Sequence, residues 1–339
     1  MLKHILLTTL LLAGPAAIAA GPTGTEASDE RNNYARLQLA AANVPGDLVS
    51  DAFIVEMMEI SLLTGVHDDT LDPTLREEIV KARDRLAERV AAGMVDDPVL
   101  MATMGHCKGR YVDEGKCDMH WARVADLAGD DGYLHFLVMS HAAAQGDEAL
   151  VAYHAARAVQ AETFESHLAA MFVPLYERFL QVPEALWPTG DDLGGHRYQA
   201  GVLAMSGGAG FGLPAYQHVF RRCEAAEGEV RQLCVGVARR LAGDSSTLMD
   251  RMVGTGMLRK FGSEQDKAWA RERRRQDQWL ARVGWTLEDQ FNDGQWDRYF
   301  EVYAEHGELA AIRHANRVLG RALEAPDDWQ PHEYGSPSE

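Results

Sequence analysis

The sequence predicts an all-α protein built from antiparallel helix pairs and stapled by two local disulfides. Apolar residues recur at helical spacing along most of the chain, and no stretch alternates for long enough to indicate a β-strand. Two cysteine pairs, Cys107 with Cys117 and Cys223 with Cys234, are each followed by the sequence LAGD and an apolar helix. The 339 residues, 46% of them hydrophobic, suffice for one large core or two small ones.

Residues 1–19 have the composition of a signal peptide. Lys3 makes the start basic, residues 5–12 are mostly apolar, and residues 17–19 have the small-x-small pattern that precedes a signal peptidase cut. We therefore expect the protein in the periplasm or secreted, without lipid attachment, because the first cysteine is Cys107. No later window reaches the roughly 20 apolar residues of a membrane helix, so we also expect no membrane anchor.

The charge of the chain argues against a nucleic-acid partner. Its formal net charge is −18, and its one basic run, residues 271–275, is short and flanked by Asp266 and Asp277. A polyanion would be repelled by the average field of such a protein. We therefore expect a protein partner and no nucleic acid.

Four cysteines in an exported chain predict two disulfides, because that compartment oxidises thiols. Three pairings are possible, and we favour Cys107 with Cys117 and Cys223 with Cys234, because each bridge would staple a corner between two helices. Each bridge closes a short loop, for which chain entropy gives about 2 to 3 kcal/mol.

The predicted N-terminal half spans residues 29–181 and follows a leader at 20–28 that has little to bury and is expected to be mobile. Its first helix, 34–42, has apolar residues at helical spacing. The second, 51–63, is apolar on nearly all sides, which predicts a central place in the core. The third, 73–93, opens on a proline, which suits the first position of a helix.

A short helix over 96–106 leads into the first cysteine hairpin. The helices 132–144 and 148–160 are joined by a three-residue connection containing glycine, so we expect antiparallel neighbours. The last helix of this half, 163–180, contains Pro174, which predicts a kink or a break.

A loop rich in Pro and Gly at 182–195 connects to the predicted C-terminal half, 196–325. Ser263 is the expected cap of one of its helices, with Asp266 three residues on. An acidic tail, 326–339, is expected to be disordered. The helices predicted in this half are 196–206, 215–226, 229–241, 246–261, 264–283, 299–306 and 308–323.

The paired cysteines, the LAGD sequence after each pair and the apolar helix Met252–Gly262 carry a resemblance. Over Asp97–Trp285 the chain resembles exported all-helical proteins of Gram-negative bacteria that have no assigned activity. Its cysteine-stapled hairpins are also similar to Sel1-like, tetratricopeptide-type repeats, although those repeat at a much shorter interval. The resemblance implies a superhelix or array of helical hairpins and no site. True duplication and two similar corners both remain open.

Histidines on apolar helix faces are the sharpest candidates for a polar site. His141 and His154 lie on the apolar stripes of two neighbouring helices, with His135 or Glu148 as further candidates. Two imidazoles at low dielectric can ligate a metal or share a proton. The alternative is hydrogen-bonded core histidines. No HExxH-type spacing supports a metal, so we predict no metal site and no cofactor.

Ser206 lies in the sequence Ala204-Met-Ser-Gly-Gly208, which matches the A-x-S-x-G variant of a hydrolase nucleophile elbow. That chemistry needs a strand before the serine, so that a strained turn exposes the hydroxyl. No strand pattern precedes Ser206. Small residues that let helices approach closely explain the run better.

The basic run of the C-terminal half is a candidate interface, because arginine and exposed tryptophan are favoured anchors of protein contacts. The alternative is a solvated basic face over buried indoles. The residues concerned are Trp269, Arg271, Arg274, Arg275 and Trp279.

With no catalytic constellation, we expect a protein–protein interaction module that presents a helical surface. The alternative function is an enzyme or a small-ligand or metal binder whose site lies between the helical halves, near His141, His154 or Ser206.

Overall fold

Every regular element in the described part of the chain is a helix, which confirms the all-α prediction. The computed structural model describes residues 25–66, 71–104, 116–188, 195–212, 216–282, 287 and 290–331. In these ranges the β-type pairing is confined to an isolated bridge between Asp131 and Thr163. None of the helices in them is long and apolar enough to cross a membrane. The predicted signal peptide, Cys107 and the end of the tail lie outside these ranges.

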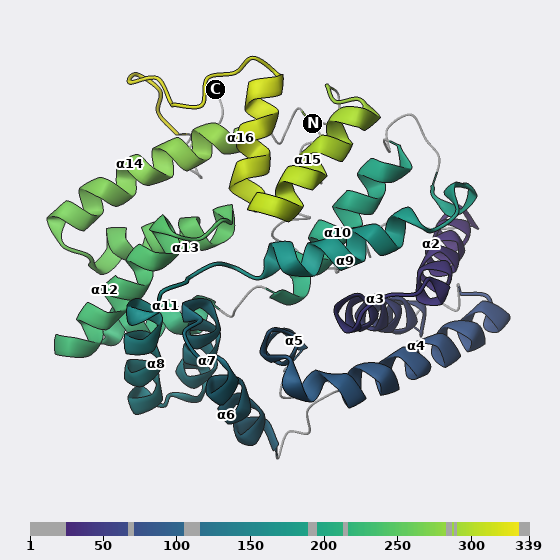
Figure 1. The fold of residues 1–339 in the computed structure, drawn as a ribbon, viewed down its shortest axis with the longest axis horizontal. Helices are drawn as coiled ribbons and strands as arrows, with labels where there is room; N and C mark the ends of the chain where they lie inside the picture. The colour runs from purple at the N-terminus through teal and green to yellow at the C-terminus, as the bar shows by residue number, and fades with distance from the viewer. Residues whose placement is uncertain are drawn as a thin grey trace. The chain divides into compact units, whose positions relative to one another are not determined.

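The chain forms two compact units, residues 1–127 with 167–213 and residues 128–166 with 214–339 (Figure 1). Unit 1 contains α2 (Thr25–Asn43), α3 (Leu48–Val66), α4 (Pro73–Gly93), η2 (Met94–Asp96), α5 (Pro98–Met104), α6 (Cys117–Leu127), α9 (Leu168–Leu180), η4 (Glu184–Leu186) and α10 (His196–Gly212). Unit 2 contains α7 (Gly132–Gln145), α8 (Glu148–Gln160), α11 (Tyr216–Ala225), α12 (Gly228–Gly243), α13 (Leu248–Phe261), α14 (Glu264–Ala281), α15 (Asp293–His306) and α16 (Glu308–Val318).

This division differs from the predicted halves, 29–181 and 196–325. Helices α7 and α8 belong with the C-terminal helices because α7 packs against α11 and α8 packs against α12. Helices α9 and α10 belong with the N-terminal ones because both pack against α3. The loop predicted at 182–195 is described only in part.

Helix α3 is the centre of unit 1, as its apolar sequence predicts. Residues 52–55 and Met58 are fully buried, and the helix contacts α2, α4, α5, α9 and α10. Its neighbour α4 begins at Pro73 as predicted. The Asp72 carboxylate before it accepts hydrogen bonds from the amides of Thr74 and Leu75, which caps the helix.

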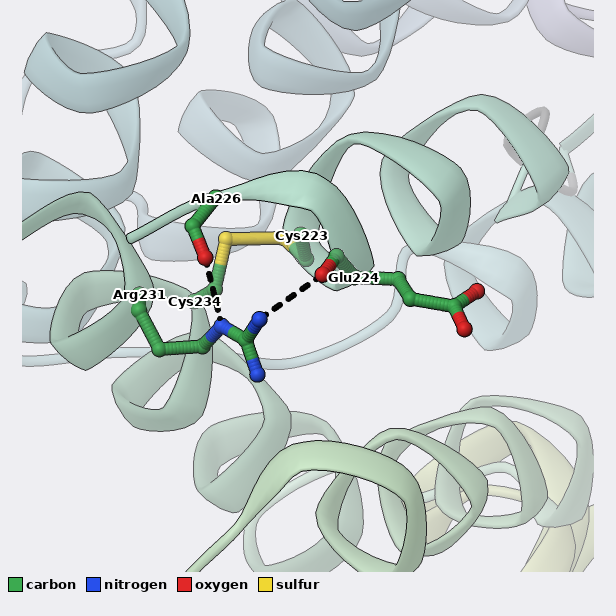
Figure 2. The surroundings of a disulfide bond; sticks show 5 residues. All are labelled: Cys223, Glu224, Ala226, Arg231 and Cys234. Carbon is green, nitrogen blue, oxygen red and sulfur yellow. Dashed lines mark hydrogen bonds between the residues drawn. A yellow bond between two sulfur atoms is a disulfide. The ribbon is translucent and has the colours of Figure 1, made fainter. Parts of the chain in front are cut away.

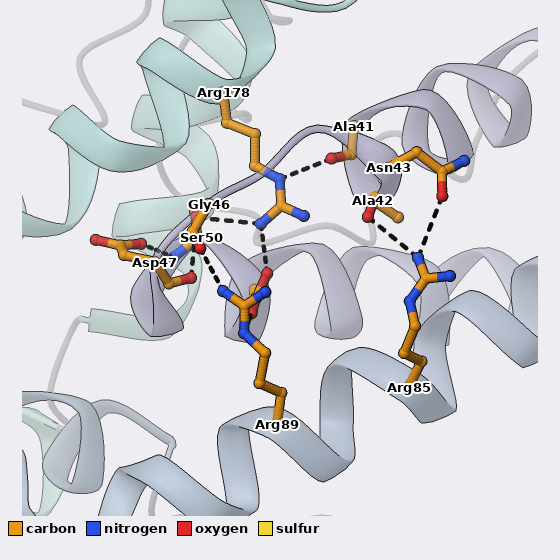
Figure 3. A network of polar contacts seen from close by, with 10 residues as sticks. Ala41, Ala42, Asn43, Gly46, Asp47, Ser50, Arg85, Arg89 and Arg178 are labelled. Atoms are coloured by element: carbon orange, nitrogen blue, oxygen red, sulfur yellow. Dashed lines mark hydrogen bonds and ion pairs between the residues drawn. The ribbon is translucent and has the colours of Figure 1, made fainter.

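Arg178 of α9 ties three helices of unit 1 together (Figure 3). Its Nε donates to the Ala41 carbonyl at 2.7 Å, near the end of α2, and its Nη1 donates to Asp51 Oδ1 of α3 at 2.6 Å. Arg178 is 2% exposed and Asp51 is fully buried. Arg89 of α4 lies 2.7 Å from the other oxygen of Asp51, and Arg85 donates to a neighbouring carbonyl of α2. Three arginines thus contact one buried carboxylate and two helix-end carbonyls.

Two predictions for unit 1 are wrong in detail. Helix α2 begins at Thr25, so residues 25–28 of the predicted leader are helical. Helix α9 starts later than predicted, at Leu168, and continues through Pro174 without a break. Proline deprives the carbonyl four residues earlier of its partner. That carbonyl belongs to Ala170, an exposed residue, so solvent can replace the missing bond.

Helix α7 is the buried centre of unit 2, with residues 132–140 all buried. Gly146 ends it at φ 78°, and Asp147 caps α8 immediately afterwards, as the predicted three-residue connection requires. Further along, Gly254 lets α13 approach α12 closely. A Cβ at this position would lie 2.5 Å from the Ala242 amide nitrogen and 2.6 Å from the Ala238 carbonyl oxygen.

The predicted disulfide between Cys223 and Cys234 is present and links α11 to α12, with 5.6 Å between the two Cα atoms (Figure 2). Arg231 completes the corner. Its guanidinium donates to the carbonyls of Glu224 and Ala226 at 2.7 and 2.8 Å, at the end of α11. The pairing of Cys117 with Cys107 lies outside the described residues and stays a prediction.

The two LAGD segments occupy different places. Leu127 ends α6 and the rest of the first copy is a loop, with Gly129 at φ 54°. In the second copy Leu241, Ala242 and Gly243 form the last turn of α12. The same four-residue sequence therefore adopts two different conformations.

We predict that Arg178→Met destabilises unit 1 by about 3 to 5 kcal/mol, because it leaves the buried Asp51 with Arg89 as its one partner and removes one of the two donors to the Ala41 carbonyl. Urea unfolding followed by the fluorescence of the buried Trp187 measures the change. The control is Lys81→Met, which breaks an ion pair with Glu77 whose side chains are 71% and 68% exposed, and should cost less than about 1 kcal/mol. Equal losses for both variants would contradict the role of Arg178.

Candidate functional site

The structure brings His154 of α8 against His135 of α7. Their Nδ1 atoms are 3.2 Å apart, and His135 Nε2 lies 3.1 Å from the Gly129 carbonyl oxygen, which also accepts from Arg157. His135 must donate through Nε2, because a carbonyl can only accept. Its Nδ1 then accepts the proton of His154 Nδ1, so the pair is neutral and orders the loop after α6.

Burial lowers the pKa of both histidines. The pKa of His154 falls to about 4, first through loss of solvation and then through the charges of His135 and Arg157. His141, the predicted partner of His154, lies six residues beyond His135 on α7 and is half-buried. Within the described ranges no three His, Cys, Asp or Glu side chains are grouped as metal ligands. The pair is therefore a structural hydrogen bond that joins α7 to α8.

Ser206 lies inside α10, so the nucleophile-elbow hypothesis is wrong. The helix runs without interruption from His196 to Gly212, and no strand delivers the serine to a turn. The adjacent Gly207 explains the small residues. A Cβ there would lie 3.0 Å from Leu175 Cδ2 of α9, so the glycine permits close packing of the two helices.

Asp250 is the centre of a buried polar cluster that the sequence analysis missed. The hydroxyls of Tyr133 and Tyr216 lie 3.2 and 2.5 Å from its Oδ1, and those of Ser245 and Thr247 lie 2.7 and 2.8 Å from its Oδ2. Burial raises the pKa of Asp250, and the hydroxyl donors oppose that rise. The two tyrosines come from α7 and α11, so one carboxyl group holds α7, α11 and α13 together.

A second acid, Glu308, lies half-buried at the start of α16. It accepts the Leu248 amide at 2.7 Å and so caps α13, while the Leu309 amide donates to the Ser246 carbonyl. Burial raises the pKa of Glu308 to about 7. Asp250 itself is fully buried. One local signal could have indicated Asp250 from the sequence. Thr247 lies three residues before it, which is the spacing of a helix cap.

The predicted interface residues are distributed around α14 with different roles. Trp269 is 42% exposed, and Arg271 is exposed as well. Arg274 is half-buried, and its pKa is lowered by burial and then by the charge of Arg259. Arg275 and Trp279, in contrast, contact the C-terminal part of the chain.

Residues 322–329, which we call the C-terminal strap, lie against α14. Trp279 Nε1 donates to the Ala322 carbonyl at 2.8 Å. The Ala325 amide donates to Gln276 Oε1 at 2.8 Å, and Arg275 Nη1 donates to the Pro326 carbonyl at 2.5 Å. Ala325 is 6% exposed. The first residues of the predicted disordered tail, 326–329, are therefore ordered by contacts with this helix.

Aromatic and cationic side chains close the same contact. The Trp279 and Trp329 rings are 5.5 Å apart in an edge-to-face arrangement. The Arg282 guanidinium lies over both, 4.4 Å from the centroid of Trp279 and 5.9 Å from that of Trp329. Such contacts add about 0.5 to 1 kcal/mol each at exposed sites. We call Arg275, Gln276, Trp279 and the adjoining Arg282 the α14 surface. This surface binds the backbone groups and one indole of a segment that has no regular secondary structure.

We predict that the neutral histidine pair makes unit 2 less stable in acid. A buried histidine with a lowered pKa favours the neutral form, so its contribution is complete above the unfolded pKa of about 6.5 and declines as the pH falls toward the folded value of about 4. Between pH 7 and 5 the loss from His154 should be about 1 to 2 kcal/mol.

His154→Asn retains a donor near Nδ1 and should flatten this profile, measured as the unfolding free energy against pH. His306→Asn, at an exposed position, should leave the profile unchanged. A profile of His154→Asn as steep as that of the wild type would refute the assignment.

No family model, no curated protein and no solved structure matches this chain. The functional conclusion therefore rests on the geometry of its own residues, and above all on the α14 surface.

Proposed function

We propose that the protein is an exported protein-interaction module whose α14 surface binds irregular peptide segments, and that the C-terminal strap occupies this surface in the free protein. The observation that carries the proposal is the way in which α14 holds the strap. Three side chains of one helix, Arg275, Gln276 and Trp279, hydrogen-bond to main-chain groups of the segment.

Because the α14 surface binds main-chain groups, a segment of another protein can take the place of the strap. Every residue of a peptide carries a carbonyl, and all but proline carry an amide, so a partner segment can make the same three hydrogen bonds. Specificity then comes from the few side chains of the bound segment that contact the surface. In the strap these are Trp329, which meets Trp279 and Arg282, and Ala325, which is buried.

Charge defines the partner further. The strap carries Glu324, Asp327 and Asp328, and it lies on the helix that contains the basic run. The pKa of Arg275 is raised, first by its hydrogen bonds to Glu272 and then by the negative charges of Glu272 and Asp327. We therefore propose a partner segment that is acidic and contains an aromatic residue.

The covalent framework supports the proposed compartment. A disulfide between Cys223 and Cys234 persists in an oxidising environment, which fits the predicted signal peptide and a place in the periplasm or outside the cell. Short corners such as Gly146-Asp147 fit the proposed antiparallel helix pairs.

The alternative function, an enzyme, has less support. Its candidate groups, the buried acid Asp250 and the histidine pair, are already hydrogen-bonded within the protein and are buried.

We predict that a labelled peptide of residues 320–331 binds full-length Trp329→Ala at least about tenfold more tightly than the wild type. The intact strap competes for the surface, and the substitution removes its indole contact while the peptide keeps its own. Fluorescence anisotropy measures the affinity. Trp269→Ala, which changes an exposed tryptophan of the same helix away from the strap contacts, should bind as the wild type does.

Trp279→Ala and Gln276→Ala should each weaken binding of this peptide in the Trp329→Ala background, and the second is a surface change that spares the fold. Affinity capture from the native envelope then tests the partner. A stoichiometric protein that is enriched with Trp329→Ala and lost with Trp279→Ala supports the proposal. Equal peptide affinity for all variants, or capture of a small molecule alone, overturns it.

A further inference from the structure

A second surface feature lies on α11, beside the C-terminal end of α7 and away from the C-terminal strap. It is a hollow of about 240 Å³, which we call the α11 hollow. His218, Arg221 and Arg222 line it from positions i, i+3 and i+4, which share one face of a helix. Ala143 and Gly146 at the end of α7 line it as well. Small residues there leave room in front of the cationic side chains.

The arginines of the hollow have few partners. Arg222 pairs with Glu148 at the start of α8. Arg221 is exposed and makes no hydrogen bond or ion pair with any described residue. The hollow therefore concentrates positive charge in a chain whose formal net charge is −18.

Arginines often donate to the free carbonyls at the end of a helix, but at the end of α7 backbone amides donate to two of these carbonyls. Elsewhere in unit 2, Arg231 and Arg273 donate to the free carbonyls at the ends of α11 and α12. At the end of α7 the carbonyls of Ala142 and Ala143 instead accept the amides of Asp147 and Gly146. These two carbonyls therefore need no arginine, and no hydrogen bond to a described residue commits the Arg221 guanidinium.

We propose that the α11 hollow binds a small oxyanion with two negative charges, such as phosphate or a dicarboxylate. Arginine matches both groups because its planar fork donates two parallel hydrogen bonds to paired oxygens. The volume is that of about eight waters at the roughly 30 Å³ each occupies in the liquid, enough for such an ion with part of its hydration shell. Arg221 supplies the uncompensated charge, Arg222 exchanges Glu148 for the ligand, and His218 adds a ring nitrogen.

Titration of the full-length protein with inorganic phosphate and, separately, with succinate tests the site, followed by NMR shifts or calorimetry at low ionic strength. Saturable binding of either ion supports the proposal, and the preferred ion identifies the oxyanion class. Arg221→Gln should weaken that binding at least about tenfold. Glu148→Gln should strengthen it, because it removes the internal competitor. Both changes lie on the surface.

The matched control is Arg271→Gln, which removes an exposed arginine of α14 and should leave the affinity unchanged. Two outcomes overturn the proposal. One is no saturation with either ion up to about 10 mM, weaker than any useful site. The other is an equal loss in Arg221→Gln and Arg271→Gln, which would be a general effect of net charge. Neither result bears on peptide binding at α14, so the two proposals succeed or fail independently.

Discussion

Free carbonyls at the ends of helices are the constraint on which this structure depends. The last four carbonyls of a helix lack partners within it, and burying them unpaired is costly. In this chain a long side chain of another helix donates to them in several places. The donors are Arg178 at the end of α2, Arg231 at the end of α11 and Arg273 at the end of α12. Asn316 donates to the Leu280 carbonyl near the end of α14. Cationic side chains suit these positions because the partial charge of a helix C-terminus is negative.

The same constraint distinguishes structural polar groups from candidate functional ones. His135 is buried and donates to a loop carbonyl, and Asp250 receives four hydroxyl donors, so both are committed within the fold. Replacing them should first affect stability. The α14 surface and Arg221 differ, because the first holds a segment that has no helical hydrogen bonds of its own and the second has no internal partner. These are the places where we propose that another molecule competes.

Local sequence predicted the elements well where a short-range signal exists. The bounds 73–93 and 148–160 agree with α4 and α8, and the cap of α14 by Ser263 is present together with the reciprocal bond that the Ser263 amide donates to the Asp266 side chain. The local disulfide at Cys223 belongs to the same class. Each of these follows from residues a few positions apart, which hydrophobic period, capping and turn chemistry describe.

The buried polar contacts and the strap contact of α14 were harder to predict because they join residues distant in sequence. Tyr133 and Asp250 are 117 positions apart, and Arg178 and Asp51 are 127 apart, so no spacing connects them. The tail from 326 reads as disordered because it is acidic and contains proline, yet Trp329 is held by a helix some 50 residues earlier (Trp279). The sequence indicated α14 as an interface without indicating that its partner is part of the same chain.

The central claim is that α14 holds an exchangeable segment, and the exchange of one amide hydrogen tests it most directly. The Ala325 amide donates to Gln276 Oε1, whereas the Ala270 amide lies within α14. Native-state hydrogen exchange gives an opening free energy for each. We expect Ala325 to open several kcal/mol more easily than Ala270, and more easily still when a competing peptide is added. Equal opening free energies would mean that the strap leaves only when unit 2 unfolds, which would contradict the account.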